Sequence, residues 1–196
     1  MSAPPADHGD PHVAFESAKL GVWTFLATEV LLFGALFTAY IVFRMKYPQM
    51  FHVEHAKLDR VLGAVNTVVL ITSSLMVVLG VDAIKRGKAR LLERYYGVTV
   101  LLGAVFLGVK YIEWTGEFHH GRYPGTNIFF SLYFMMTGLH GIHVLLGMGL
   151  LSYVIILSRR GRLSANYFAP AEMSGLYWHF VDLVWIYLFP LLYLIG

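Results

Sequence analysis

The stretch IFFSLYFMMTGLHGIHVLLGMGLLSYVIIL, residues 128–157, decides the fold class, because it contains no Asp, Glu, Lys or Arg. A helix rises about 1.5 Å per residue and needs roughly 20 apolar residues to cross the hydrocarbon core of a bilayer. The stretch is longer than this, which predicts a tilted or protruding transmembrane helix. It also lacks the alternation of barrel strands, so a helix is the structure that satisfies its backbone in lipid.

Four further stretches have the same apolar character: residues 20–43, 61–84, 95–114 and 174–195. The connections between them are polar and too short to hold a domain. The sequence therefore predicts an all-α integral membrane bundle of five transmembrane helices over residues 18–196. Residues 1–17, which are rich in Pro, Ala, Asp and His, are predicted to form a disordered N-terminal leader.

The composition supports a membrane protein and limits its partners. Hydrophobic residues make up 57% of the chain and charged residues 14%, whereas soluble domains carry about 25% charged residues. The net charge of +3 is small and scattered, which predicts no nucleic-acid partner. The absence of Cys from the sequence excludes disulfides, thiolate metal sites and Cys-ligated iron–sulfur clusters.

The distribution of Lys and Arg predicts the orientation in the membrane. The leader and the connections after the second and fourth spans hold nine such residues, against five in the connections on the other side. Because cytoplasmic loops carry an excess of positive charge, we expect a cytoplasmic N-terminus and a periplasmic C-terminus.

Several polar side chains lie inside the predicted spans, where each ionisable group costs at least a few kcal/mol by insertion scales and so needs a reason. They are Glu29, Asn66, Lys110, Glu113, His140, His143, His179 and Asp182.

Six of these residues form three sets with i, i+3 spacing, which places both members on one helical face. Lys110 with Glu113, and His179 with Asp182, can pair within one helix. His140 and His143 cannot pair favourably if both are charged, so they face other helices or at least one is neutral. For all three sets, buried polar clamps are favoured over a functional role.

Glu29 has no charged partner three or four residues away in its own helix. It is therefore either neutral, because desolvation disfavours the carboxylate, or paired with another helix. A structural role and a proton-linked or regulatory role remain equally open for this carboxyl, which we expect to be largely neutral at pH 7.

The sequence predicts no catalytic residue, cofactor or metal in this chain. The nine His residues do not form the dense boxes of membrane di-iron enzymes. His143 and His179 could offer one haem-ligating pair, but the usual two-helix pattern is missing. Walker and dinucleotide-binding motifs are absent from the sequence. A small transporter is a weaker alternative, because five spans without an internal repeat argue against one.

Three motifs, in order along the chain, resemble one membrane protein family. They are KLGVWTFLATEVLLFGALFTAY (residues 19–40), TGLHGIHVLLG (137–147) and YWHFVDLVWIYLFPLLYL (177–194); KYIEW (110–114) resembles the bacterial branch. The chain is thus similar to subunit III of the haem–copper oxidases, and it begins where the third helix of the longest, seven-helix members begins. It therefore resembles the five-helix bacterial form and lacks the two helices that partly build a phospholipid-holding cleft.

The resemblance implies a non-catalytic subunit of a proton-translocating cytochrome c oxidase, which reduces oxygen to water in the respiratory chain of a bacterial inner membrane. Haem and copper would lie in partner subunits. This chain would pack on subunit I, near subunit II and smaller subunits, and could bind phospholipid. Glu29 matches the carbodiimide-reactive glutamate of the family. His140, His143, His179 and Asp182 match motif positions and carry over as bundle-stabilising.

Two related readings stay open beside the cytochrome c oxidase. One is subunit III of a quinol oxidase, and the other is the small membrane subunit of nitric oxide reductase. Subunit III does not touch the electron donor, so the copper motif of the neighbouring subunit II would distinguish a cytochrome c oxidase from a quinol oxidase.

Overall fold

The computed structural model describes residues 11–195, and within that range it contains no strand beyond an isolated bridge between Ser164 and Tyr167. The helices are α1 (Pro11–Lys46), α2 (Pro48–His55), α3 (Arg60–Lys85), α4 (Ala89–His119), α5 (Ile128–Arg159) and α6 (Ala169–Phe189). A π-helical turn, η1 (Pro190–Leu194), continues α6.

Five of these helices are long and apolar enough to cross a membrane, which confirms the predicted fold class. The helices extend past most predicted bounds, since polar residues that flank an apolar span continue the helix beyond the hydrocarbon. The short α2 was not predicted and lies within the connection after the first span. Most of the predicted disordered leader lies outside the described residues, and its residues 11–17 belong to α1.

Local sequence signals fix where the long helices begin and end. The Asp59 side chain accepts hydrogen bonds from the backbone N–H groups of Val61 and Leu62 at the start of α3, and the Asn127 side chain accepts one from that of Phe130 at the start of α5. Gly87, Gly121 and Gly161 follow α3, α4 and α5 with φ of 72°, 72° and 68°. Glycine adopts this left-handed conformation without strain, so each of these helices stops where the polar connection begins.

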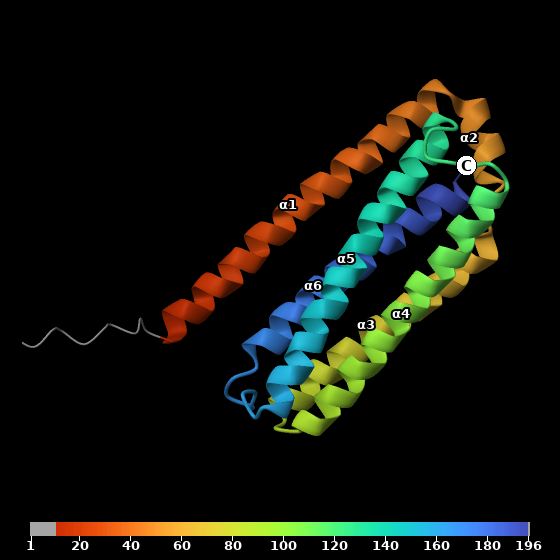
Figure 1. Cartoon of the computed structure of the whole chain (residues 1–196). Helices are drawn as coiled ribbons and strands as arrows, with labels where there is room; N and C mark the ends of the chain where they lie inside the picture. Colours follow the sequence, from red (N-terminus) through yellow and green to blue (C-terminus); the bar gives the residue numbers. More distant parts are fainter. Residues whose placement is uncertain (1–10, 196) are drawn as a thin grey trace, which may run out of the picture.

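The four helices α3, α4, α5 and α6 form a closed ring in which each contacts the next and α3 contacts α6. Helix α1 lies outside this ring against α5 and α6, and its N-terminal part diverges from them (Figure 1). The start of α1 and the α3–α4 and α5–α6 connections lie at one end, here called the N-terminal end. Helix α2, the α4–α5 connection and η1 lie at the opposite, C-terminal end.

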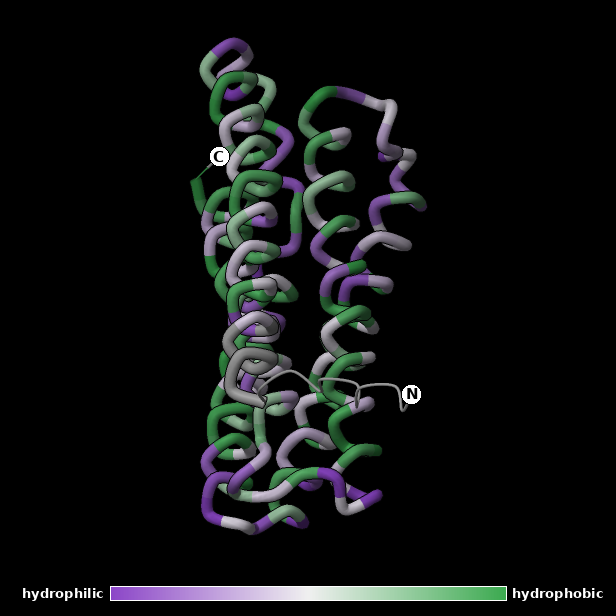
Figure 2. Tube along the Cα trace, turned by 90° about the vertical axis from the view of Figure 1, so that its left-hand side faces the viewer, coloured by the Kyte–Doolittle hydropathy of each residue, from purple (hydrophilic) through white to green (hydrophobic). Residues whose placement is uncertain are grey.

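The hydrophilic segments gather at these two ends, and the helices between them are mostly hydrophobic (Figure 2). Each long helix also exposes large apolar side chains on its outward face, for example Leu31, Val61, Leu101, Ile142 and Leu183. A surface of this kind would associate in water and is the surface expected against lipid or membrane partners.

Glycine permits a close helix approach between α5 and α6. A Cβ added to Gly147 would lie 2.7 Å from the Trp178 ring, so the indole fits only because position 147 has no side chain. Trp178 is fully buried, and its indole thereby fixes the separation of the two helices.

Candidate functional site

The carboxyl of Glu29 lies on the narrow seam through which α1 contacts the ring. Among the α1 side chains that the structure describes, the buried ones are Leu26, Phe33 and Tyr40, which recur every seven positions, as in a coiled-coil seam. Glu29 shares their face, and its Oε2 lies 2.9 Å from Nε2 of His143 on α5. Of the two states left open by the sequence, the structure thus provides the pairing with another helix.

The second ring nitrogen of His143 limits where the protons of this pair can be. Its Nδ1 lies 2.8 Å from the backbone oxygen of Leu139, which can only accept, so Nδ1 carries a hydrogen. Nε2 then either accepts from a protonated Glu29 or, as part of an imidazolium, donates to a carboxylate. In both arrangements one proton lies between the residues and the net charge of the pair is zero, which suits an apolar setting.

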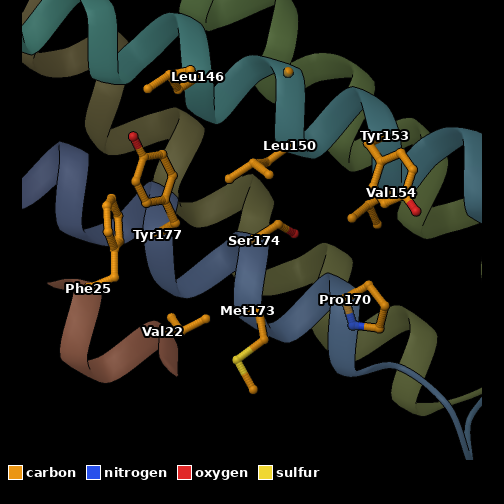
Figure 3. A pocket seen from close by; sticks show the side chains of 11 residues that line it. Val22, Phe25, Leu146, Leu150, Tyr153, Val154, Pro170, Met173, Ser174 and Tyr177 are labelled. Atoms are coloured by element: carbon orange, nitrogen blue, oxygen red, sulfur yellow. The ribbon is translucent and has the colours of Figure 1, made fainter. Parts of the chain in front are cut away.

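An apolar groove runs beside this pair at the N-terminal end. It has a volume of about 540 Å³ and lies between α1, α5 and α6 (Figure 3). Phe25, one turn before Glu29, faces Tyr177 across the groove with ring centroids 6.1 Å apart. The Tyr177 hydroxyl donates to the backbone oxygen of His143 at 3.3 Å, so the groove is bounded by a residue that touches the pair.

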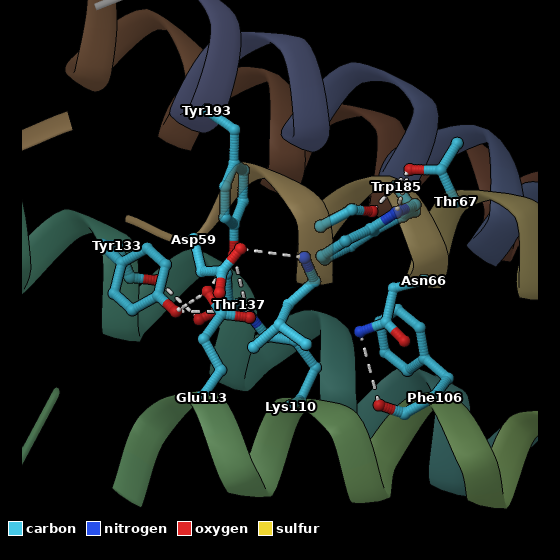
Figure 4. Close-up of polar contacts among 12 residues, drawn as sticks. Asp59, Asn66, Thr67, Phe106, Lys110, Glu113, Tyr133, Thr137, Trp185 and Tyr193 are labelled. Carbon is cyan, nitrogen blue, oxygen red and sulfur yellow. Dashed lines mark hydrogen bonds and ion pairs between the residues drawn. The ribbon is translucent and has the colours of Figure 1, made fainter. Parts of the chain in front are cut away.

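Lys110 and Glu113 form the within-helix pair expected from their spacing, at 3.1 Å, inside a larger network (Figure 4). Lys110 Nζ also lies 3.2 Å from the hydroxyl of Tyr133 on α5 and 2.9 Å from that of Tyr193 in η1. Both hydroxyls donate to Glu113 Oε1, at 2.7 and 2.5 Å. The network joins α4, α5 and η1, and Trp185 adds a ring face 5.4 Å from the ammonium.

The seam between α3 and α6 holds a row of hydrogen bonds between ring nitrogens of α6 and hydroxyl groups of α3. Trp185 Nε1 donates to the Thr67 hydroxyl at 3.1 Å, and Trp178 Nε1 donates to the Ser73 hydroxyl at 3.0 Å. His179 Nδ1 lies 2.6 Å from the Ser74 hydroxyl. The polar groups of the WHFVDLVW segment therefore face α3.

The pair between His179 and Asp182 that their spacing allows does not form. The His179 ring turns toward Ser74, and Asp182 lies 4% exposed with no hydrogen bond to either carboxyl oxygen from any described residue. The two residues share a helical face, but α3 offers the imidazole a hydroxyl acceptor or donor at closer range. The spacing allowed this pair within α6, and the pair does not form for this geometric reason.

His140 and Asn66 are buried without complete hydrogen bonding. Both His140 nitrogens lack a partner among the described residues, and the ring packs against Phe106 and Trp185 at centroid distances of 5.5 and 5.3 Å. Asn66 donates to the Phe106 backbone oxygen at 3.5 Å, and its own side-chain oxygen has no described partner. Of the two histidines expected to bond to other helices, only His143 does so within the described chain.

Several residues of these clusters were missed from the sequence. Tyr133, Tyr193 and Ser74 are ordinary residues of apolar helices, and no spacing within their own helix marks them. Within residues 11–195, three or more His, Asp or Glu side chains do not gather in a group that could hold a metal ion.

Comparison with known proteins gives a family over nearly the whole chain. Residues 7–196 match the family model described as Cytochrome c oxidase subunit III. A cytochrome c oxidase subunit 3 of Thermostichus vulcanus is 38% identical over 96% of this chain and 92% of its own length. That of Bacillus sp. strain PS3 is 36% identical over 90% and 85%, and a quinol oxidase subunit 3 of Bacillus subtilis is 30% identical over 97% of each chain.

Proposed function

Because this chain belongs to the cytochrome c oxidase subunit III family, we propose that it is the subunit III of a bacterial haem–copper terminal oxidase. In this role it carries no redox centre and packs on the subunit that binds haem and copper. The observation that carries the proposal is the family match over residues 7–196, which includes every span and the Glu29–His143 pair.

Glu29 and His143 are the residues through which we expect the subunit to support sustained proton-coupled turnover. Their side chains are 13% and 9% exposed, and the pair holds one proton in an apolar setting at the edge of a groove. The pair is neutral while it holds this proton, and releasing the proton leaves a net charge of only one in lipid. A carboxyl of this kind is also open to hydrophobic reagents that enter from the bilayer.

The electron donor that we favour is cytochrome c. The relatives named for cytochrome c oxidase are 38% and 36% identical, against 30% for the quinol oxidase relative. The quinol oxidase remains the second candidate, because that relative aligns over 97% of both chains. A copper-binding Cys/His motif in the co-purified subunit II would establish cytochrome c as the donor.

The membrane that we propose is the bacterial inner membrane, with the N-terminal end of the bundle in the cytoplasm. The connections with the larger number of Lys and Arg residues meet at this end, together with the start of α1 (Figure 1). The apolar outer faces of the five spans would then contact phospholipid and the neighbouring subunits.

The proposal is tested by purifying the chain in mild detergent through a tag on residues 1–10, followed by an optical spectrum and peptide identification. We expect haem absorbance and two larger subunits, one of them with the haem- and copper-binding histidines. A colourless chain without partners, prepared beside an intact respiratory complex as control, would contradict the proposal and favour a transporter.

A further inference from the structure

The short helix α2 lies at the C-terminal end of the bundle and is anchored there by Phe51 (Figure 1). Phe51 is fully buried, and its ring lies against those of Tyr40 on α1 and Phe129 on α5, at centroid distances of 5.2 and 5.4 Å. Helix α2 ends one turn later at His55, and residues 56–59 join it to Arg60, the first residue of α3. A contact between these two helix ends closes the connection.

His55 makes that contact, and its two ring nitrogens both have a partner although the residue is only 4% exposed. Nδ1 lies 2.9 Å from the backbone oxygen of His52, which can only accept, so Nδ1 carries a hydrogen. Nε2 lies 3.2 Å from a guanidinium nitrogen of Arg60, which can only donate, so Nε2 carries none. The two contacts together require a neutral imidazole with its hydrogen on Nδ1.

The acids beside His55 in the sequence are engaged elsewhere. Glu54 pairs with Lys57 at 2.8 Å, and Asp59 accepts from the first backbone N–H groups of α3. Arg60 itself lies in the first turn of α3, where the helix dipole disfavours a cation. The lone pair on the imidazole is therefore what holds the guanidinium beside α2.

The elements that pack on α2, namely α1, α5 and η1, bring no counter-charge for a protonated His55. Helix α1 ends in two cations, Arg44 and Lys46. Neither α5 nor η1 contains an Asp or Glu residue, and their titratable groups at this end are Tyr133 and Tyr193, which are engaged in the α4 network. A proton on His55 thus adds a buried cation next to Arg60, which is costly.

We propose that His55 and Arg60 form a pH-sensitive clasp between α2 and α3, which is closed while His55 is neutral and opens when Nε2 takes up a proton. The proton comes from water at the C-terminal surface, where the adjoining His52 and Ala56 are exposed. The added hydrogen occupies the lone pair that accepts from Arg60, so two cationic donors then face each other. The guanidinium leaves, and the end of α2 moves toward water. Loss of the proton restores the contact.

In the orientation proposed above, the clasp lies on the side of the membrane opposite the cytoplasm. It then opens as protons accumulate on that side, and this assignment of the side rests on the proposed function. The contact itself does not, because the geometry of His55 and Arg60 is the same in either orientation. A measurement of the clasp in the complex therefore tests it separately from the role of the subunit.

Spin-label distance measurements on the intact complex in nanodiscs test the proposal. The sequence contains no Cys, so Ala56→Cys and Val68→Cys place one label beyond the end of α2 and one on the outward face of α3, both at exposed positions. We expect a narrow distance distribution at about pH 8 that broadens and shifts to longer distances at about pH 5, the range in which histidine ordinarily changes its charge.

Three variants in this labelled background separate the clasp from other effects of acid. His55→Gln should stay narrow at both pH values, because its amide oxygen can accept from Arg60 and does not titrate. Arg60→Met should be broad at both, because it removes the donor. His52→Gln is the matched control and should keep the wild-type response, because His52 supplies only its backbone oxygen to the clasp.

The ¹⁵N NMR spectrum of ring-labelled histidine reports the proton positions, with the His55 signals assigned by their loss in His55→Gln. A hydrogen on Nε2 at about pH 8 would overturn the proposal, as would a distance distribution that is the same at both pH values or a pH response retained in His55→Gln. If His55→Gln does not assemble, Arg60→Met takes its place, and a pH response retained in that variant has the same consequence.

Discussion

Replacing Lys110 by Met should lower the free energy of unfolding by about 3–5 kcal/mol, because it leaves a buried charge without its partner. The Lys110 and Glu113 side chains are only 8% and 2% exposed, so water cannot replace the lost ammonium. The hydroxyls of Tyr133 and Tyr193 still donate to the carboxylate in the variant. They carry partial charges only and do not cancel its net charge.

The double variant Lys110→Met/Glu113→Gln separates this electrostatic cost from lost packing. It removes both charges, and the amide oxygen introduced at position 113 can still accept from one of the two tyrosines. The remaining loss is then about 1–3 kcal/mol for the hydroxyl left without an acceptor. The double variant should therefore be more stable than Lys110→Met alone, which a double-mutant cycle reports directly.

The assay is an SDS titration in mild detergent that follows tryptophan fluorescence. Lys57→Met is the matched control, since Lys57 and Glu54 form a pair of the same spacing at 2.8 Å, with side chains 39% and 15% exposed. That variant should change the free energy of unfolding by less than about 1 kcal/mol. A double variant no more stable than Lys110→Met would refute the reasoning.

Two further predictions concern contacts of α5. Gly147→Leu should destabilise the bundle by about 1–3 kcal/mol, because the new side chain meets the Trp178 ring. Gly149→Leu is its control and should be nearly neutral, because nothing lies within 4 Å of a Cβ at that position. Thermal unfolding of both variants checks this prediction. Glu29→Gln should abolish carbodiimide labelling yet keep wild-type stability, because its amide can donate to His143. Retained labelling, or a stability loss matching that of Glu29→Leu, would count against this account of the pair.

The membrane fold could be predicted because its signal lies within single segments. Each span is an apolar run, and the run alone determines that the segment is a helix of at least a given length. The missed element, α2, has no such run, since PQMFHVEH mixes polar and apolar residues over two turns. The sequence likewise carries no sign that η1 widens to a π-helical turn, which lies where Tyr193 reaches the α4 network.

The candidate site could be predicted only where both partners lie on one helix. Lys110 and Glu113 satisfied that condition, and their pair formed. Glu29 was recognised as anomalous from its own helix, but its partner is 114 positions away along the chain. The spacing of His179 and Asp182 also allowed a pair within one helix, but His179 contacts the Ser74 hydroxyl on α3 instead.

The WHFVDLVW segment therefore supplies the indole donors of a hydrogen-bonding pattern whose hydroxyl acceptors lie on α3. Its two indole N–H groups are seven residues apart, about 10.5 Å along α6, and their acceptors Ser73 and Thr67 are six residues apart, about 9 Å along an antiparallel helix. In hydrocarbon an indole N–H needs an acceptor at that depth, so the two rows fix the register of α3 against α6. Small hydroxyl residues are inconspicuous in an apolar span, which is why the aromatic half alone is visible as a motif. A sliding of either helix by one turn would break both bonds together, so the seam acts as one cooperative contact.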